Sequence, residues 1–172
     1  AEDLSSAVWG TFTLPESATR FRDLRLIRNL DPARPSAERK EITVLANGGS
    51  LTIGGQGWSH PAGRFDRLPA SAKGKVRGQV YSLGRDSAGI IVEFETDSPE
   101  LHVRWELGRE RIAMPHMAAT GVSGLDLYGL IDGAWRWVAV ARPKGTKENA
   151  AELFTGQQRE VRSFRLYLPL YN

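Results

Sequence analysis

Serine is the first candidate for chemistry in this chain, because a serine hydrolase needs a nucleophile, a neighbouring base and an oxyanion hole. The glycine-rich segment Asn47-Gly48-Gly49-Ser50 comes nearest to a nucleophile turn. It lacks the G-x-S-x-G spacing, and no Asp-x-x-His sequence is present to supply an acid and a base together. We therefore interpret the segment as a tight turn between two strands and predict no catalytic residue in this chain.

Metal ligands and cofactor motifs are sparse. The three histidines, His60, His102 and His116, lie far apart, without the close spacing of a zinc site. The chain has no cysteine, which excludes thiolate metal sites and disulfides. The glycines of 54–57 are not followed by the Lys-Ser/Thr pair of a phosphate loop. We predict no cofactor and no metal site, although a structural calcium ion in a loop stays open.

Aromatic side chains are candidates for ligand binding, because a flat ring with a polar edge can stack on a sugar. The sequence pattern places Trp105 in a core, and it favours core or interface positions for Trp135 and Trp137. Trp58 is the best exposed candidate, since it lies in the long irregular segment 54–74. The same segment contains three further candidates for ligand or interface contacts, His60, Asp66 and Arg67. Asp66 and Arg67 are expected to form a local salt bridge.

The elements that must position these residues alternate with period two. Residues 88–96 and 101–107 place apolar side chains on one face and charged side chains on the other, as half-buried antiparallel strands do. Asp97-Ser98-Pro99-Glu100 joins them with typical turn residues, and this predicts a hairpin. A second hairpin is predicted for 125–131 and 134–141, because Asp132-Gly133 suits a type I′ turn.

Further strands are expected at a spacing near ten residues, namely 10–14, 24–27, 42–45, 51–53, 77–83 and 163–168. Only 147–154 indicates a helix of two turns, and 32–40 is a helical turn or a loop. This pattern predicts an all-β fold, an antiparallel β-sandwich with a jelly-roll-like arrangement. With 172 residues, the chain is expected to form a single domain, 1–172.

Composition narrows the possible partners. The net charge is +3, and 18 of the 23 basic residues are arginine, but acidic and basic residues alternate along the chain. This distribution is typical of a solvated, salt-bridged surface and argues against nucleic acid as a partner. No apolar run reaches the roughly 18 residues of a membrane span. The first residues, AEDLSS, contain no signal peptide and are compatible with the end left by signal cleavage.

The last nine residues, FRLYLPLYN, form an apolar strand followed by Pro169, Leu170 and Tyr171. Proline ends the ladder, which leaves Leu170 and Tyr171 without a core of their own. We expect a longer polypeptide in which these two side chains lie at a domain junction. The separated chain is then expected to self-associate through them.

Three sequence segments resemble a known family: FDRLPA (65–70), YSLGRDSAGIIVEFETDSPELHVRWEL (81–107) and MPHMAATGVSGLDLYGLIDGAWRW (114–137). Together they resemble the N-terminal domain of bacterial SGNH/GDSL-type esterases, which a GxDLY motif marks. Here the motif is Gly124-Leu125-Asp126-Leu127-Tyr128. The resemblance implies a β-sandwich packed against a separate catalytic domain, which holds the nucleophile, and an esterase that acts on acylated carbohydrate. It also implies a periplasmic or secreted location.

The motif residues can also be assigned roles from their types. Asp126 and Tyr128 share a strand face opposite the two leucines, and both are candidates for ligand or interface contacts. Asp126 is expected to form a structural ion pair with an arginine or an interface contact, with direct contact to a ligand as the alternative. His116 lies between Pro115 and Met117 in a loop, where packing or solvent exposure is expected.

Three readings of the whole chain follow from these observations. It is a non-catalytic accessory domain that positions substrate or stabilises the catalytic domain. Alternatively, it is an independent carbohydrate-binding module. The third reading is a hydrolase that assembles its triad only in three dimensions.

Overall fold

The computed structural model describes residues 24–28, 41–45, 51–58 and 65–172, and includes the side chains of the last two ranges. The statements below concern these residues. The expected strand at 10–14, the segment 32–40, the turn at 47–50 and His60 lie outside them. No helix in the described residues is long and apolar enough to cross a membrane.

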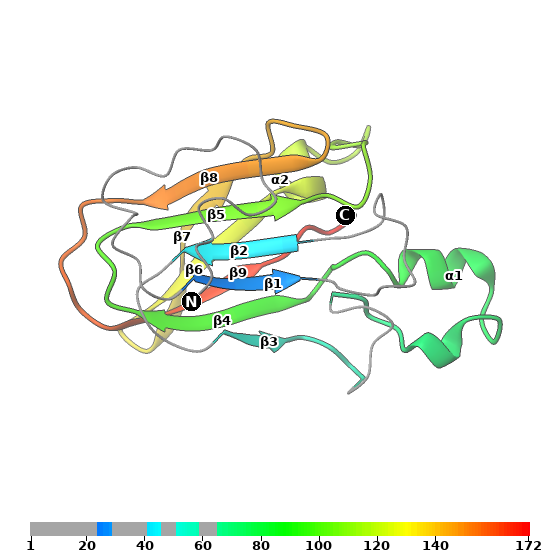
Figure 1. Ribbon diagram of the computed structural model, residues 1–172, viewed down its shortest axis with the longest axis horizontal. Coiled ribbons are helices and arrows are strands. Elements are labelled where there is room, and N and C mark those ends of the chain that lie inside the picture. The colour runs from blue at the N-terminus through cyan, green and yellow to red at the C-terminus, as the bar shows by residue number, and fades with distance from the viewer. Residues whose placement is uncertain (1–23, 29–40, 46–50, 59–64) are drawn as a thin grey trace.

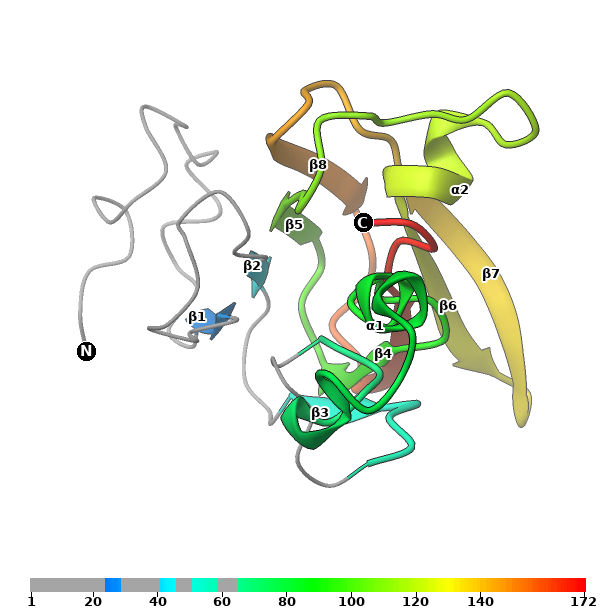
Figure 2. The same ribbon diagram turned by 90° about the vertical axis from the view of Figure 1, so that its right-hand side faces the viewer.

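Nine described strands form two antiparallel sheets (Figure 1). The four-stranded sheet has the order β1-β2-β5-β8, with strands Leu24–Arg28, Glu41–Leu45, Leu101–Glu106 and Glu148–Phe154. The five-stranded sheet has the order β3-β4-β9-β6-β7, with strands Thr52–Gly54, Ile91–Thr96, Arg162–Tyr167, Leu125–Ile131 and Ala134–Ala141. Figure 2 shows the sheets as two layers, and the predicted all-β sandwich is therefore confirmed. The jelly-roll arrangement stays a prediction.

The core fills the space between the sheets. Val92 and Phe94 of β4 and Val103 and Trp105 of β5 belong to one buried cluster, and all four are at most 5% exposed. Burying a side chain of this size stabilises the fold by about 1.5–3 kcal/mol. The buried indole of Trp105 donates a 2.9 Å hydrogen bond to the carbonyl oxygen of Ser123, which satisfies its polar edge.

The hairpin predicted for β4 and β5 is wrong, although both strands exist. β4 pairs with β3 and β9, whereas β5 pairs with β2 and β8. The connection Asp97–Glu100 crosses from one sheet to the other. Buried Ser98 stabilises this corner, since its Oγ donates to the Glu100 carbonyl at 2.5 Å, and the amide of Gln157 binds the Pro99 carbonyl.

β5 differs from the expected half-buried strand because both of its faces are covered. His102 and Arg104, expected on an exposed face, are 4% and 9% exposed. Nε2 of His102 lies 3.4 Å from the Glu100 carboxylate. Burial lowers the pKa of Arg104, and the charge of Glu148 partly opposes this change.

Two local predictions are reversed. Residues 77–83 were expected to form a strand, but Gly78–Leu83 is the helix α1, preceded by a short 3-10 turn at Ala70–Ala72. Residues 147–154 were expected to form a helix, but they contain β8. Ladder pairing with β5 and burial of Asn149 and Leu153 outweigh the helix propensity of alanine and glutamate there.

The second hairpin is confirmed with the predicted bounds of both strands, β6 and β7. Asp132 and Gly133 have φ values of 52° and 74°, as a type I′ turn requires. A short helix, α2 (Ala119–Ser123), leads directly into β6.

Candidate functional site

The GxDLY motif forms the junction between α2 and β6. Gly124 lies where the two elements meet, and a methyl group there would approach the carbonyl oxygens of Thr120 and Ala141, the latter at 2.8 Å. Leu125 and Leu127 are fully buried in the core. Three of the five motif residues therefore serve packing.

The other two motif residues point away from the core, as predicted. Oδ1 of Asp126 accepts a 3.1 Å hydrogen bond from the indole Nε1 of Trp137. Among the described residues, the partner of Asp126 is therefore a tryptophan and not the predicted arginine. The ring of Tyr128 meets that of Tyr167 edge to face, with centroids 5.2 Å apart. Each motif side chain thus contacts a neighbouring strand of its own sheet.

A β-bulge determines which way the two tryptophans of β7 point. The register shifts between Leu127 and Tyr128, because β7 has one extra residue there, Val138. Val138 and the next residue, Ala139, both pack against the core. Trp135 and Trp137 lie across from outward-facing β6 residues, and Trp137 is 57% exposed. A core position is thus wrong for Trp137.

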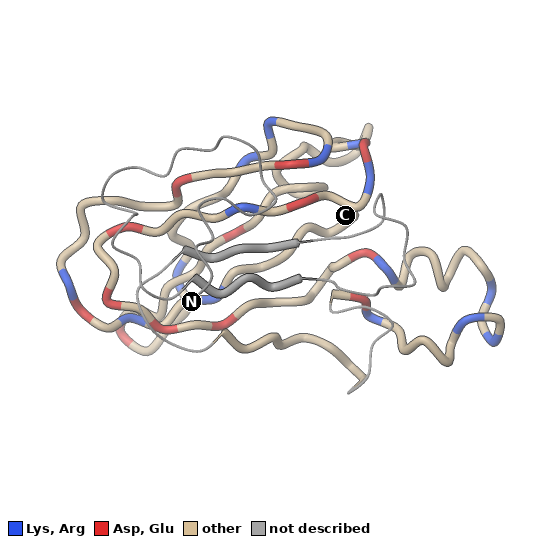
Figure 3. Tube along the Cα trace, in the orientation of Figure 1, with Lys and Arg blue, Asp and Glu red and all other residues tan. Residues whose placement is uncertain are grey.

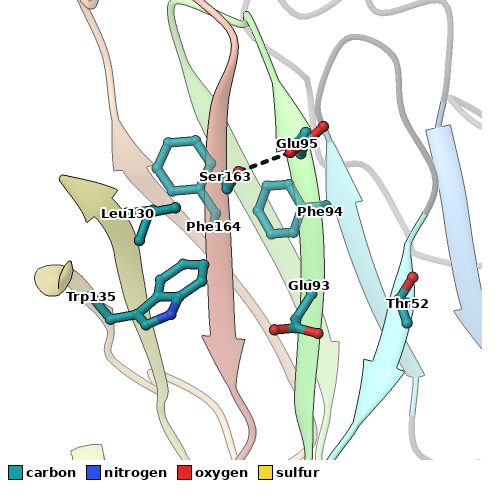
Figure 4. A pocket seen from close by; sticks show the side chains of 8 residues that line it. All are labelled: Thr52, Glu93, Phe94, Glu95, Leu130, Trp135, Ser163 and Phe164. Carbon is teal, nitrogen blue, oxygen red and sulfur yellow. Dashed lines mark hydrogen bonds between the residues drawn. The ribbon is translucent and has the colours of Figure 1, made fainter. Parts of the chain in front are cut away.

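A cavity of about 500 Å³ lies over this part of the five-stranded sheet (Figure 4). We call it the sheet-face groove. It crosses β7, β6, β9, β4 and β3 and is lined by Thr52, Glu93, Phe94, Glu95, Leu130, Trp135, Ser163 and Phe164.

The charged and hydroxyl groups that line the groove are bonded across the strands, and one of their partners, Arg165, lies beside it. Nε of Arg165 donates to Oε1 of Glu93 at 2.6 Å, and its guanidinium lies 4.1 Å from the ring centre of Trp135. Oγ of Ser163 donates to Oε1 of Glu95 at 2.9 Å. The arrangement can hold a ligand that offers both an apolar face and hydrogen-bond donors.

A second cluster forms at the C-terminal corner, which we define as Met114, His116, Met117, Leu170 and Tyr171. The exposed ring of His116 packs edge to face on Tyr171, with centroids 6.2 Å apart. Met114 and Met117 bond each other through their backbones and hold the turn between them. Leu170 is 40% exposed. The corner therefore presents apolar surface next to α2.

The backbone of this corner is firmly held. The amides of Leu170 and Tyr171 bond the carbonyls of Gly121 and Val122 in α2. The buried side chain of Asn172 accepts a bond from the Arg109 amide at 2.9 Å and donates to Ser123 Oγ at 2.6 Å. These contacts join the corner to the residue that precedes the GxDLY motif.

The remaining candidates lie in or beside the loop after β3. Trp58 is 54% exposed, as predicted. Asp66 is buried, and its carbonyl accepts a bond from Gln56. The guanidinium of Arg67 donates to the carbonyl oxygens of Leu83 and Asp86 at the end of α1, in place of the expected salt bridge with Asp66.

The structure divides the predicted residues among three places. Asp126 and Tyr128 lie on the sheet face, His116 joins Leu170 and Tyr171 at the corner, and the described loop residues lie elsewhere. The sequence reasoning missed the groove residues as a group, although the period-two pattern had placed Glu93 and Glu95 opposite the core. Strand order, which that pattern does not contain, brings them beside β9 and β7.

Hydrolase chemistry has few groups to draw on in the described residues. His102 is buried beside Glu100, whereas His116 is exposed against Tyr171. Within the same residues, no three His, Asp or Glu side chains converge as metal ligands would. Figure 3 shows acidic and basic residues interspersed along the trace. Basic residues also gather at the tip of the protrusion that is formed by the 3-10 turn Ala70–Ala72 and α1.

Comparison with known families explains the motif. A family model described as the N-terminus of SGNH-hydrolase-type esterases, and named GxDLY, matches residues 45–172. The match covers most of the chain. This chain belongs to the GxDLY family. The GxDLY motif is therefore a feature of the whole family, and in this domain it forms the junction between α2 and β6.

Among solved structures, the domain resembles that of a Bacteroides ovatus protein that carries the name GDSL-like lipase. The two are 23% identical with a TM-score of 0.67, which shows a shared fold. The alignment covers 87% of this chain and 38% of that protein, so the domain corresponds to little more than a third of it. No curated protein matches the chain.

Proposed function

We propose that this GxDLY domain is the non-catalytic N-terminal domain of an SGNH-type esterase. It stabilises a catalytic domain by packing against it and helps to position the substrate, a carbohydrate ester. The observation that supports this proposal is the use of every GxDLY residue in contacts within the domain. Because the motif residues make contacts within the domain, we assign them a structural role and assign the acyl-transfer chemistry to a separate catalytic domain.

The C-terminal corner is our proposed contact surface for the catalytic domain. Its apolar side chains are partly exposed while its backbone is anchored to α2, so the surface is presented in a fixed shape. Interfaces between domains of one chain typically bury about 600–1,500 Å². We place the enzyme in the periplasm or outside the cell, in keeping with the resemblance on which the proposal draws.

The first test is the gene sequence that follows the codon for Asn172. We expect it to encode a catalytic domain with a Gly-Asp-Ser nucleophile block. The isolated 172-residue chain should then hydrolyse nitrophenyl acetate no faster than the buffer. A stop codon at that position would instead favour an independent carbohydrate-binding module, and steady turnover by the isolated chain would contradict a non-catalytic role.

The second test compares Leu170→Asp with Val161→Asp in the two-domain polypeptide. Val161 is 69% exposed in the β8–β9 connection and provides a matched apolar control. A carboxylate at position 170 should lower the melting temperature of the catalytic domain, because it places a charge in an apolar interface. Equal melting temperatures for the two variants would reject the corner as the contact surface.

A further inference from the structure

The aromatic side chains beside the sheet-face groove are held in fixed orientations. The Asp126 carboxylate binds the edge of the Trp137 indole at 3.1 Å, while Arg165 covers one face of Trp135 at 4.1 Å. Trp137 nevertheless keeps 57% of its surface exposed. A rigid, exposed ring loses little conformational freedom when a ligand stacks on it.

The polar groups of the groove define the ligand further. Within the described part of the chain, Arg165 bonds Oε1 of Glu93 and Ser163 bonds Oε1 of Glu95. Their second oxygens are acceptors that suit hydroxyl donors. Among the described residues named on this face, three are carboxylates, Glu93, Glu95 and Asp126, and the guanidinium of Arg165 already neutralises Glu93. An anionic ligand would therefore be repelled.

A protein partner suits this surface less well. The centres of protein interfaces are depleted of charged residues, and burying Glu93 and Glu95 against a second protein would cost desolvation of both carboxylates. A sugar ring has an apolar C–H face for an aromatic ring and hydroxyls for the carboxylates. The cavity volume of about 500 Å³ falls within the range of small-ligand sites, roughly 300–1,000 Å³.

We propose that the sheet-face groove, together with Trp137, binds a neutral oligosaccharide. Trp137 supplies the stacking surface, and Glu93 and Glu95 accept hydroxyl hydrogens. Arg165 is a positioning residue that fixes Trp135 and Glu93. This inference deepens the substrate-positioning part of the proposed function by naming the site and the ligand class, but it concerns binding by the domain itself.

Isothermal titration of the 172-residue chain with cellohexaose, xylohexaose and mannohexaose, and with oligogalacturonate as an anionic probe, tests the site. We expect saturable binding of at least one neutral hexasaccharide, with a Kd of about 1 mM or lower, and no binding of oligogalacturonate. Trp137→Ala should weaken binding about tenfold, the loss of one stacking contact. Glu95→Gln should weaken it as well, with an unchanged circular dichroism spectrum.

Trp58→Ala is the matched control, because Trp58 is 54% exposed and the segment after β3 lies near α1, at the opposite end of the sandwich from the β6–β7 turn (Figure 1). It should leave binding unchanged. Absence of saturable binding for all three neutral probes, equal losses in the Trp58 and Trp137 variants, or preference for oligogalacturonate would overturn the proposal. So would a dimer that dissociates on Trp137→Ala, because a second copy would then cover the face.

The two proposals can fail separately. Loss of stability in the two-domain Leu170→Asp variant concerns the corner, whereas oligosaccharide titration of the isolated chain concerns the sheet face. Amide chemical shifts recorded during the titration should change in β4, β6, β7 and β9. Changes confined to α2 and residues 168–172 would place any binding at the corner and reject the groove.

Discussion

Replacing Gly124 with alanine tests whether the GxDLY glycine is required by packing. Its φ of −87° and ψ of 176° are open to any residue, so the cost must come from contact alone. The new methyl group would lie 2.8 Å from the Ala141 carbonyl oxygen and would also press on the Thr120 carbonyl. Both neighbours are backbone atoms, so α2 and β7 must move apart to make room.

Forced overpacking of this kind costs about 1–3 kcal/mol. That is a large share of the roughly 5–15 kcal/mol by which a domain is stable. Urea unfolding followed by tryptophan fluorescence gives the free energy directly. With a slope of about 2 kcal/mol per molar urea, a loss of about 2 kcal/mol lowers the midpoint by about 1 M.

Gly57→Ala provides the control, because a methyl group there would meet nothing within 4 Å and the backbone has no positive φ. It should be neutral or stabilising by up to about 1 kcal/mol, since alanine restricts the unfolded chain. If Gly124→Ala unfolds at the same urea concentration as Gly57→Ala, the packing argument for the motif glycine is refuted.

Three further predictions concern other parts of the domain. Sedimentation of the 172-residue chain should show concentration-dependent association that Leu170→Asp reduces and Val161→Asp does not; a strict monomer at high concentration would contradict the exposed corner. A double-mutant cycle of Arg165→Ala and Glu93→Gln should give a coupling of about 0.2–1 kcal/mol, because the pair is partly exposed; zero coupling would argue that the pair does not form in solution. Gly133→Ala should destabilise by about 1–2 kcal/mol in thermal unfolding, because its φ of 74° is left-handed while its surroundings are open; an unchanged melting temperature would contradict the type I′ turn.

The sequence predicted most of the strands but misassigned one pairing, for a physical reason. Period-two alternation shows which face of a strand is buried. Because the core lies between two sheets, strands of either sheet show the same alternation, and the pattern does not indicate which strands pair. Four residues can close a hairpin or cross between sheets about 10 Å apart. The connection between β4 and β5 is a buried corner at Ser98. The next residue, Pro99, accepts a backbone hydrogen bond from Gln157, which is distant in sequence and therefore outside the reach of a local pattern.

The two reversed elements illustrate the competition between local and tertiary preferences. Asn149, Ala151 and Leu153 alternate along β8 as in a strand. The high helix propensity of the alanine and glutamate residues in the same segment favoured the wrong prediction of a helix. In the protrusion, Val76, Val80 and Leu83 are spaced as on a helix, and all three are exposed. Arg67, which binds the carbonyls of Leu83 and Asp86, stabilises the end of α1 from another part of the chain.

The β-bulge at Val138 explains why the candidate site could not be found from the sequence. Strict alternation along β7 would place Trp135, Trp137, Ala139 and Ala141 on one face. With Ala141 buried and Ala139 partly buried, that pattern would place both tryptophans in the core. The extra residue reverses the phase, so Ala141 remains buried beside Leu125 while Trp137 faces outward across from Tyr128. The GxDLY strand therefore has two functions: its leucines hold the core, and its Asp126 and Tyr128 support the aromatic surface that the bulge turns outward.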